Sequence, residues 1–118
     1  MSIAAALILA AGAGKRFGGQ KLLAELDGAP ILQHVLDLAA SAGLDPVAVV
    51  LGPDADAPTR RLSWRNEVRL INPDPGAGLS SSVRLGLAAL ASSEAQRAVV
   101  LLGDQPRLSS AQLDVILG

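Results

Sequence analysis

The sequence has no cysteine and no tyrosine, and it has only one histidine, one phenylalanine and one tryptophan among 118 residues. Without thiols the chain can form neither a disulfide scaffold nor a thiolate zinc site, and it has no cysteine nucleophile. One histidine is too few for a histidine-rich metal site. The aromatic residues are also too few to build the stacking platforms that bind single-stranded nucleic acid. These absences exclude several classes of enzyme and of nucleic-acid-binding protein.

The chain also has almost no excess of charge of either sign, because ten Lys and Arg residues oppose eleven Asp and Glu residues, giving a net charge of −1. Such a chain has no overall field to attract nucleic acid or an anionic membrane, so neither is expected as a partner. Half of the residues are hydrophobic and 18% are charged, which excludes a disordered tail. The length predicts one domain, residues 1–118, with a core built mainly from 21 alanines and 21 leucines.

The N-terminal segment is apolar but differs from a secretory signal. Its first charge, Lys15, follows the apolar run instead of preceding it. The run is also far shorter than the roughly 20 residues that span a bilayer. We therefore expect a buried strand here and a cytoplasmic protein.

Short apolar runs alternate with amphipathic segments along the chain. The expected strands are Ile3–Ala10, Val47–Leu51, Val68–Ile71 and Ala98–Leu102, and the expected helices are Pro30–Ala42, Ala55–Trp64, Ser80–Ala91 and Ala111–Leu117. This strand–helix alternation predicts an α/β fold in which helices cover both faces of a parallel sheet.

Three conspicuous sequence features fall where expected strands end. They are the glycine-rich stretch Gly12–Lys21, the turn Gly52–Asp54 and the turn Gly103–Pro106. Ligands of such sheets bind beyond the carboxyl ends of the strands. The convergence of these features predicts a binding site at that edge.

The glycine-rich stretch combines flexible backbone with positive charge: its glycines are Gly12, Gly14, Gly18 and Gly19, and its cations are Lys15, Arg16 and Lys21. Glycines allow a sharp turn that brings N–H groups close to phosphate oxygens. The pattern favours a phosphate-binding loop. The alternative is a plain strand-to-helix turn with solvated cations.

Two familiar phosphate loops do not match the spacing. In a Walker loop starting at Gly14, Gln20 would occupy the lysine position, and no hydroxyl residue for magnesium follows. In a dinucleotide fingerprint starting at Gly12, Phe17 occupies the place of the third glycine. A nicotinamide-dependent oxidoreductase is therefore the weakest of the functional hypotheses.

The strand-end motifs, taken together, resemble a known family. The matching residues are Leu9–Gly12, Arg16, Gly18, Lys21 and Leu22, then Asn72-Pro73, Gly78–Val83 and Gly86-Leu87, and finally Leu102–Pro106. In this order the sequence resembles the MobA-like NTP transferases, most closely their molybdenum cofactor cytidylyltransferase branch. The resemblance covers nearly the whole chain and implies a Rossmann-like three-layer nucleotidyltransferase fold with a mostly parallel sheet. Members of the family are longer, so the resemblance also implies that a C-terminal part is missing.

The resemblance further implies transfer of CMP from CTP to a phosphorylated acceptor such as molybdopterin, with release of pyrophosphate. Mg²⁺ would be the cofactor, GTP the alternative donor and a molybdoenzyme a client of the product. This chemistry needs positioning and charge neutralisation more than an acid–base pair. Magnesium accordingly prefers one or two carboxylates together with phosphate oxygens.

The resemblance also assigns roles to individual residues. Arg16, Lys21 and Asp104 would be catalytic: Arg16 would hold the outer phosphates, Lys21 would neutralise charge on the α-phosphate, and Asp104 would bind the metal. The other residues expected at the nucleotide are Ala11, Gly12, Gly14, Gly78, Ser80 and Ser82. Ala11 stands where guanylyltransferase relatives usually have a second glycine, and it favours CTP over GTP.

Several alternatives stay open at this point. A nucleotide-binding module without turnover would have the same motifs. Ser80–Ser82 also suit the cap of a helix, and Asn72 before a proline is a common turn former. His34 and Trp64 are expected to have structural roles.

Overall fold

The computed structural model describes residues 4–11, 23–53, 56–74, 79–103 and 113–116. The strands are β1 (Ala4–Ala10), β2 (Glu25–Leu26), β3 (Ala29–Pro30), β4 (Val47–Leu51), β5 (Val68–Ile71), β6 (Arg97–Leu102) and β7 (Leu113–Ile116). The helices are α2 (Ile31–Ser41), α3 (Asp56–Arg61) and α4 (Leu79–Leu90).

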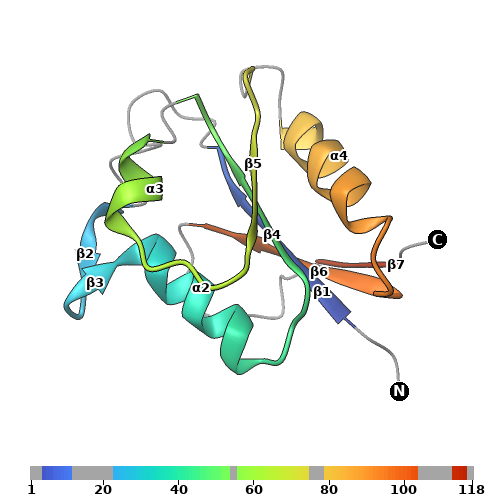
Figure 1. Cartoon of the computed structure of the whole chain (residues 1–118), viewed down its shortest axis with the longest axis horizontal. Coiled ribbons are helices and arrows are strands. Elements are labelled where there is room, and N and C mark those ends of the chain that lie inside the picture. Colours follow the sequence, from blue (N-terminus) through green and yellow to red (C-terminus); the bar gives the residue numbers. More distant parts are fainter. Residues whose placement is uncertain (1–3, 12–22, 54–55, 75–78, 104–112, 117–118) are drawn as a thin grey trace.

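A five-stranded sheet in the order β5-β4-β1-β6-β7 forms the centre of the structure (Figure 1). The pairs β5–β4, β4–β1 and β1–β6 are parallel. The sheet therefore has one edge at which the carboxyl ends of four strands meet. This arrangement confirms the predicted α/β fold.

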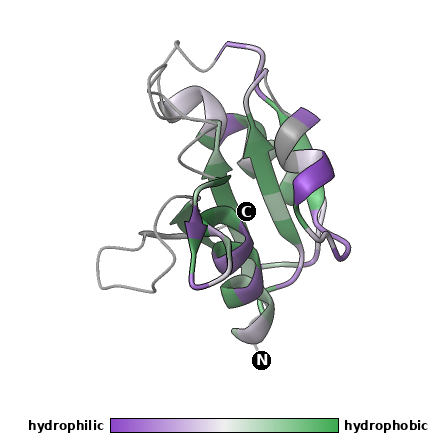
Figure 2. Cartoon of the chain, turned by 90° about the vertical axis from the view of Figure 1, so that its left-hand side faces the viewer, coloured by the Kyte–Doolittle hydropathy of each residue, from purple (hydrophilic) through white to green (hydrophobic). Residues whose placement is uncertain are grey.

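Alternating residues of β1 face two separate hydrophobic clusters. Ala6, Ile8 and Ala10 pack in one cluster with Leu32, Val35, Leu36 and Ala39 of α2. Ala5, Leu7 and Leu9 pack in the other with Leu90 of α4. Strand side chains point alternately to opposite faces, so a strand covered on both sides must be apolar throughout. Figure 2 shows strands coloured as hydrophobic at the centre and helices that include both hydrophobic and hydrophilic segments.

Most elements lie close to their predicted positions. The strand at Val68–Ile71 is found as predicted, and α4 begins and ends one residue before its predicted bounds. The helix predicted at Ala55–Trp64 is shorter, because α3 ends at Arg61 and the chain then leads into β5. Trp64 packs against the hydrophobic cluster that includes the α2 residues. Its Nε1 donates to the Thr59 carbonyl oxygen at 3.1 Å, and both contacts agree with a structural role.

The prediction of a final helix over Ala111–Leu117 is wrong. Residues 113–116 form β7, which pairs antiparallel with β6. A helix of about seven residues is marginal on its own, whereas a strand here satisfies the backbone groups along the outer side of β6. Leu, Val and Ile also suit a strand, and tertiary pairing overrides the weak helical pattern.

The small β2–β3 hairpin is absent from the predicted elements. Its turn is Asp27-Gly28, and both residues have positive φ, 51° and 87°. An Asp-Gly pair is a strong signal for such a two-residue turn, so the sequence did contain the information. The hairpin leads into α2, and His34 Nε2 contacts the Leu26 carbonyl oxygen across this junction.

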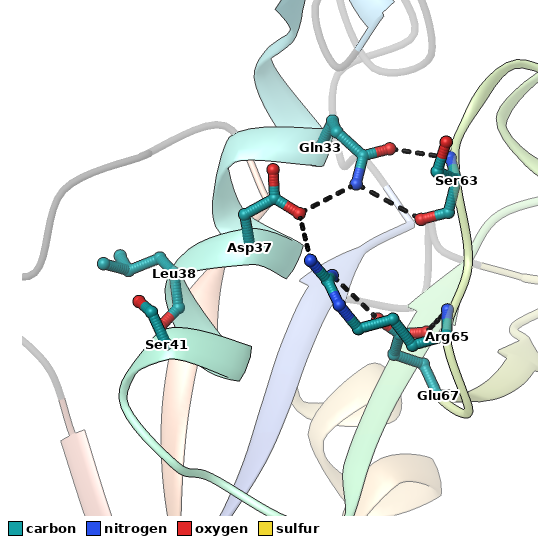
Figure 3. Close-up of polar contacts among 7 residues, drawn as sticks. All are labelled: Gln33, Asp37, Leu38, Ser41, Ser63, Arg65 and Glu67. Atoms are coloured by element: carbon teal, nitrogen blue, oxygen red, sulfur yellow. Dashed lines mark hydrogen bonds and ion pairs between the residues drawn. The ribbon is translucent and has the colours of Figure 1, made fainter.

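A polar network fastens α2 to the segment between α3 and β5 (Figure 3). Gln33 accepts from the Ser63 backbone N–H at 2.7 Å and donates to the Ser63 carbonyl oxygen at 3.2 Å. Arg65 forms an ion pair with Asp37 at 3.0 Å. The Glu67 carboxylate accepts from the Arg65 backbone N–H at 2.6 Å. The Gln33 side-chain amide and the Ser63 backbone thus form two hydrogen bonds in opposite directions, as two paired strands do.

We expect Gln33→Ala to lower the free energy of unfolding by about 1–2 kcal/mol, because it leaves both Ser63 backbone groups without their side-chain partner. Arg65→Ala should cost less than about 1 kcal/mol, since the Arg65 and Asp37 side chains are each 50% exposed and water screens their attraction. Urea unfolding followed by circular dichroism measures both. A larger loss in Arg65→Ala than in Gln33→Ala would show that the ion pair contributes more to this attachment than the amide does.

No helix in the described part of the chain is long and apolar enough to cross a membrane.

Candidate functional site

The carboxyl edge of the sheet brings together the residues that follow four parallel strands. They are Ala11 after β1, Gly52 after β4, Asn72 after β5 and Gly103 after β6. The Gly103 N–H donates to the Leu9 carbonyl oxygen at 2.9 Å, and the Asn72 N–H donates to the Leu51 carbonyl oxygen at 2.7 Å. Backbone hydrogen bonds thus hold these strand ends in a fixed register.

Gly52 and Ala11 approach each other closely at this edge. A Cβ atom on residue 52 would lie 2.7 Å from the Ala11 carbonyl oxygen. A Cβ atom cannot pack that close to an oxygen atom to which it is not bonded, so only glycine fits beside the residue that precedes Gly12. The sequence marked Gly52 as a strand-end turn but gave no indication of this contact.

Asn72 joins the end of β5 to the first turn of α4. Its side chain is buried, with 5% of the residue exposed. Its Nδ2 donates to Ser81 Oγ and to Ser82 Oγ, each at 2.9 Å. Its Oδ1 accepts from the Asp74 N–H at 3.0 Å, the turn that an asparagine before proline commonly makes. Asn72 therefore serves both as a turn former and as a link to the serines.

The structure places only some of the predicted site residues. Ala11 is half-buried at the end of β1, while Ser80 is exposed and Ser82 is buried in the first turn of α4. Ala11 and Ser82 thus lie on segments that are anchored at the carboxyl edge, one by β1 and the other through Asn72.

The remaining predicted residues lie outside the described part of the chain. They are Gly12, Gly14, Arg16, Lys21, Gly78 and Asp104. Ala11 and Gly103, which precede Gly12 and Asp104 in the sequence, are both at the carboxyl edge and are connected through paired strands.

The four strand-end residues, Ala11, Gly52, Asn72 and Gly103, carry no charge. Within the described ranges, no group of three or more His, Asp or Glu side chains is arranged to hold a metal ion.

The mostly parallel α/β fold is that of a nucleotidyltransferase-type domain. Residues 6–117 match the model of the MobA-like NTP transferase domain. The chain therefore belongs to the MobA-like NTP transferase family, as the motifs predicted.

The similar curated proteins include transferases named for different nucleotides. A probable molybdenum cofactor guanylyltransferase of Thermococcus gammatolerans is 30% identical over 93% of this chain and 53% of its own length. A 2-C-methyl-D-erythritol 4-phosphate cytidylyltransferase of Cereibacter sphaeroides is 36% identical over 86% of this chain and 47% of its own length. The bifunctional protein GlmU of Halalkalibacterium halodurans is 33% identical over 99% of this chain and 26% of its own length. The chain thus spans from a quarter to about half of the length of these relatives.

Solved structures agree with the fold. Rv0371c of Mycobacterium tuberculosis has a TM-score of 0.80 and 30% identity over 92% of this chain and 55% of its own. A complex of Rv0371c with manganese has a TM-score of 0.70 and 28% identity over 92% of this chain and 54% of its own. This family membership favours the nucleotidyltransferase hypothesis over the nicotinamide-dependent one.

Proposed function

We propose that the chain binds CTP at the carboxyl edge of its sheet and transfers CMP to a phosphorylated small-molecule acceptor such as molybdopterin. The observation that carries the proposal is the convergence of the family motifs on this edge: Ala11, Asn72 and Gly103 each belong to one of the three motifs. Each of them follows the carboxyl end of a parallel strand, where ligands of such sheets bind.

In the proposed reaction, a phosphate oxygen of the acceptor attacks the α-phosphorus of CTP. The bond from that phosphorus to the bridging oxygen of pyrophosphate breaks, and the CMP group remains on the acceptor. Backbone N–H groups of Gly12 and Gly14 bind the triphosphate, and Arg16 holds its outer phosphates. Lys21 neutralises the charge that develops on the α-phosphate. These roles supply positioning and electrostatic stabilisation, which account for most of the catalysis in phosphoryl transfer.

The donor set of the proposed site fits a divalent metal that arrives with the nucleotide. Asp104 provides one carboxylate after β6, and the phosphate oxygens would supply further ligands, as Mg²⁺ prefers. Bound there, Mg²⁺ or Mn²⁺ would screen the charge of the phosphates. The manganese complex of Rv0371c supports a divalent metal in a structural relative.

The serine-containing turn and Ala11 are proposed to contact the nucleotide. Gly78, Ser80 and Ser82 belong to the motif that leads into α4, and the Asn72 link anchors this turn at the carboxyl edge. Ala11 favours CTP over GTP by its place in the family motif. A cytidylyltransferase and a guanylyltransferase both occur among the relatives, so the donor base requires a direct test.

Calorimetric titration with CTP and GTP, with and without Mg²⁺, tests the proposal. We expect magnesium-dependent binding of CTP, weaker binding of GTP, and at least a roughly tenfold loss of CTP affinity in Asp104→Ala, as for one charged contact. Glu94→Ala is the matched control, because Glu94 is an exposed carboxylate that precedes β6 at the opposite edge of the sheet. Absence of binding by the folded chain, or an equal loss in both variants, would contradict the assignment.

Pyrophosphate release separates turnover from binding alone. Incubation with CTP, Mg²⁺ and molybdopterin should release pyrophosphate in the wild-type chain and not in Lys21→Ala. Magnesium-dependent binding without release would instead identify a nucleotide-binding module.

A further inference from the structure

Strand β5 forms one edge of the five-stranded sheet, and β4 is its partner in the described part of the chain. The Asn72 N–H donates to the Leu51 carbonyl oxygen of β4, so the backbone groups of Asn72 point toward β4. Along a strand, the backbone groups of successive residues point alternately to one side and to the other. The N–H and C=O groups of Arg69 and Ile71 therefore point outward, away from β4. We call these groups, with the side chains of β5, the β5 edge.

The β5 edge combines outward backbone groups with exposed apolar side chains. Val68 is 43% exposed and Ile71 is 55% exposed. Proteins usually protect a sheet edge with a charged side chain or a proline that prevents further pairing. The charged residue of β5 is Arg69, and its guanidinium carbon lies 5.1 Å from the centroid of the Trp64 ring. This contact draws the charge over Trp64, on the face of the sheet that α2 covers, and leaves the edge accessible to another strand.

Positive charge is concentrated beside the β5 edge. Four of the ten Lys and Arg residues lie between Arg60 and Arg69, both included, and this stretch has a single acidic residue, Glu67. The Glu67 side chain is 3% exposed, so its charge contributes little to the surface. Arg65 is already paired with a carboxylate of α2 (Figure 3). Among the described residues, Arg60, Arg61 and Arg69 have no carboxylate partner, and we call these three the basic region.

The charge of the basic region decides what can complete the β5 edge. A second copy of the chain would pair β5 with β5 and bring two basic regions together, where like charges repel. A nucleic acid would supply negative charge, but its sugar–phosphate backbone has no alternating N–H and C=O groups to pair with Arg69 and Ile71. An extended acidic polypeptide supplies both the opposite charge and the backbone partners.

The two faces of β5 determine the side-chain pattern of such a partner. Arg69 is the register partner of Val49, which belongs to the hydrophobic cluster that includes the α2 residues. Leu70 is the register partner of Val50, and both pack in the cluster on the α4 side. A strand beside β5 therefore meets a cation on one face and apolar side chains on the other. Since its own side chains alternate between the faces, the matching sequence alternates acidic and apolar residues.

We propose that the β5 edge binds an extended segment of a partner protein in which acidic and apolar residues alternate, and that this segment adds to the sheet as an antiparallel strand. Its backbone pairs with the outward N–H and C=O groups of Arg69 and Ile71. Its acidic side chains face the basic region, and its apolar side chains pack beside Val68 and Leu70. The nucleotide takes no part in these contacts, so this inference is independent of the proposed function.

Titration of the full chain with a synthetic peptide tests the charge requirement. The probe is an end-capped peptide of alternating glutamate and valine, roughly seven residues long, labelled for fluorescence anisotropy. We expect it to bind, and we expect at least about tenfold weaker binding when lysine replaces every glutamate, since like charges across an interface are strongly unfavourable. Absence of binding by the glutamate peptide, or equal affinity for both peptides, overturns the proposal.

Arg69→Pro tests the outward backbone pairing. Proline lacks the N–H that points away from β4, and sheet edges tolerate proline at such a position, so the pairing of β5 with β4 should persist. We expect an unchanged circular dichroism spectrum and at least about tenfold lower affinity for the glutamate peptide. Arg69→Ala is the matched control, because it loses the charge but keeps the N–H, and it should lose less than about fivefold, as for one exposed ion pair. Arg84→Ala, at an exposed position of α4, should bind like the wild type. Equal losses in the two Arg69 variants would show that no strand is added.

N-methylated peptides test the same pairing without changing the protein. In an antiparallel pair, the residues opposite Arg69 and Ile71 direct their N–H groups toward β5, and in the probe these residues are the glutamates. Methylation of the glutamate nitrogens should therefore lower the affinity at least about tenfold, whereas methylation of the valine nitrogens should leave it nearly unchanged. If Arg69→Pro does not fold, full binding of the peptide with methylated glutamates still overturns the proposal.

Two further results would identify a different occupant of the β5 edge. In analytical ultracentrifugation of the chain alone, a dimer that Arg69→Pro dissociates would mean that a second copy occupies the edge. A single-stranded oligonucleotide that binds more tightly than the glutamate peptide, with unchanged affinity in Arg69→Pro, would identify a general surface for polyanions. Either result overturns the proposal.

Discussion

Gly86→Ala is expected to destabilise the protein, although alanine normally stabilises the interior of a helix. Gly86 is in α4, and a Cβ atom there would lie 2.0 Å from Cδ1 of Leu7 in β1. Leu7 is fully buried, so its side chain cannot turn away without displacing its neighbours. Overpacking of this kind costs about 1–3 kcal/mol, more than the roughly 1 kcal/mol that alanine gains over glycine in a helix. Urea unfolding should therefore show a lower free energy of unfolding.

Two further variants separate packing from helix propensity. Ala88 is exposed on the same helix, and Ala88→Gly should cost about 1 kcal/mol by propensity alone. In a Leu7→Ala background, which removes the contacting methyl groups, Gly86→Ala should become stabilising. A Gly86→Ala protein more stable than the wild type, with Leu7 intact, would show that the sheet and α4 can separate at little cost.

The sequence predicted the core of the fold well because that part depends on local patterns. A continuous apolar run defines β1, since both of its faces are covered. The stripe of Leu32, Val35 and Leu36 likewise defines α2. The segment at 113–116 was assigned a helix in place of a strand, because the pairing of β7 with β6 is a tertiary contact that no local period reports.

The candidate site was predictable to a smaller extent. Motifs at strand ends predicted that the site lies at the carboxyl edge, because parallel topology alone brings those positions together. The contact between Asn72 and the serines was not predictable, since a separation of nine or ten residues does not specify which side chains face each other. Likewise, the sequence marks Gly52 as a turn residue, but its closeness to Ala11 depends on the register of β1 with β4.

Gly52→Ala is expected to lower CTP affinity by at least about tenfold. The added Cβ would lie 2.7 Å from the Ala11 carbonyl oxygen, and a backbone atom in a central strand end cannot move aside cheaply. The substitution therefore displaces Ala11, the residue that precedes Gly12 in the proposed phosphate-binding loop. Phosphate loops act through backbone N–H groups held in advance, and a displacement of about 1 Å can cost as much as a hundredfold in a positioned site. Calorimetric titration with CTP and Mg²⁺ measures the effect.

Gly43→Ala provides the matched control for this last variant. Gly43 follows α2 with a φ of 75°, and a Cβ there would meet no atom within 4 Å. The strained backbone should cost about 1 kcal/mol of stability without any displacement at the carboxyl edge. We therefore expect Gly43→Ala to unfold at lower urea concentration than the wild type but to bind CTP with wild-type affinity. Equal affinity losses in the two variants would mean that general destabilisation weakens binding. Unchanged CTP affinity in Gly52→Ala would mean that the position of Ala11 does not control the proposed phosphate-binding loop.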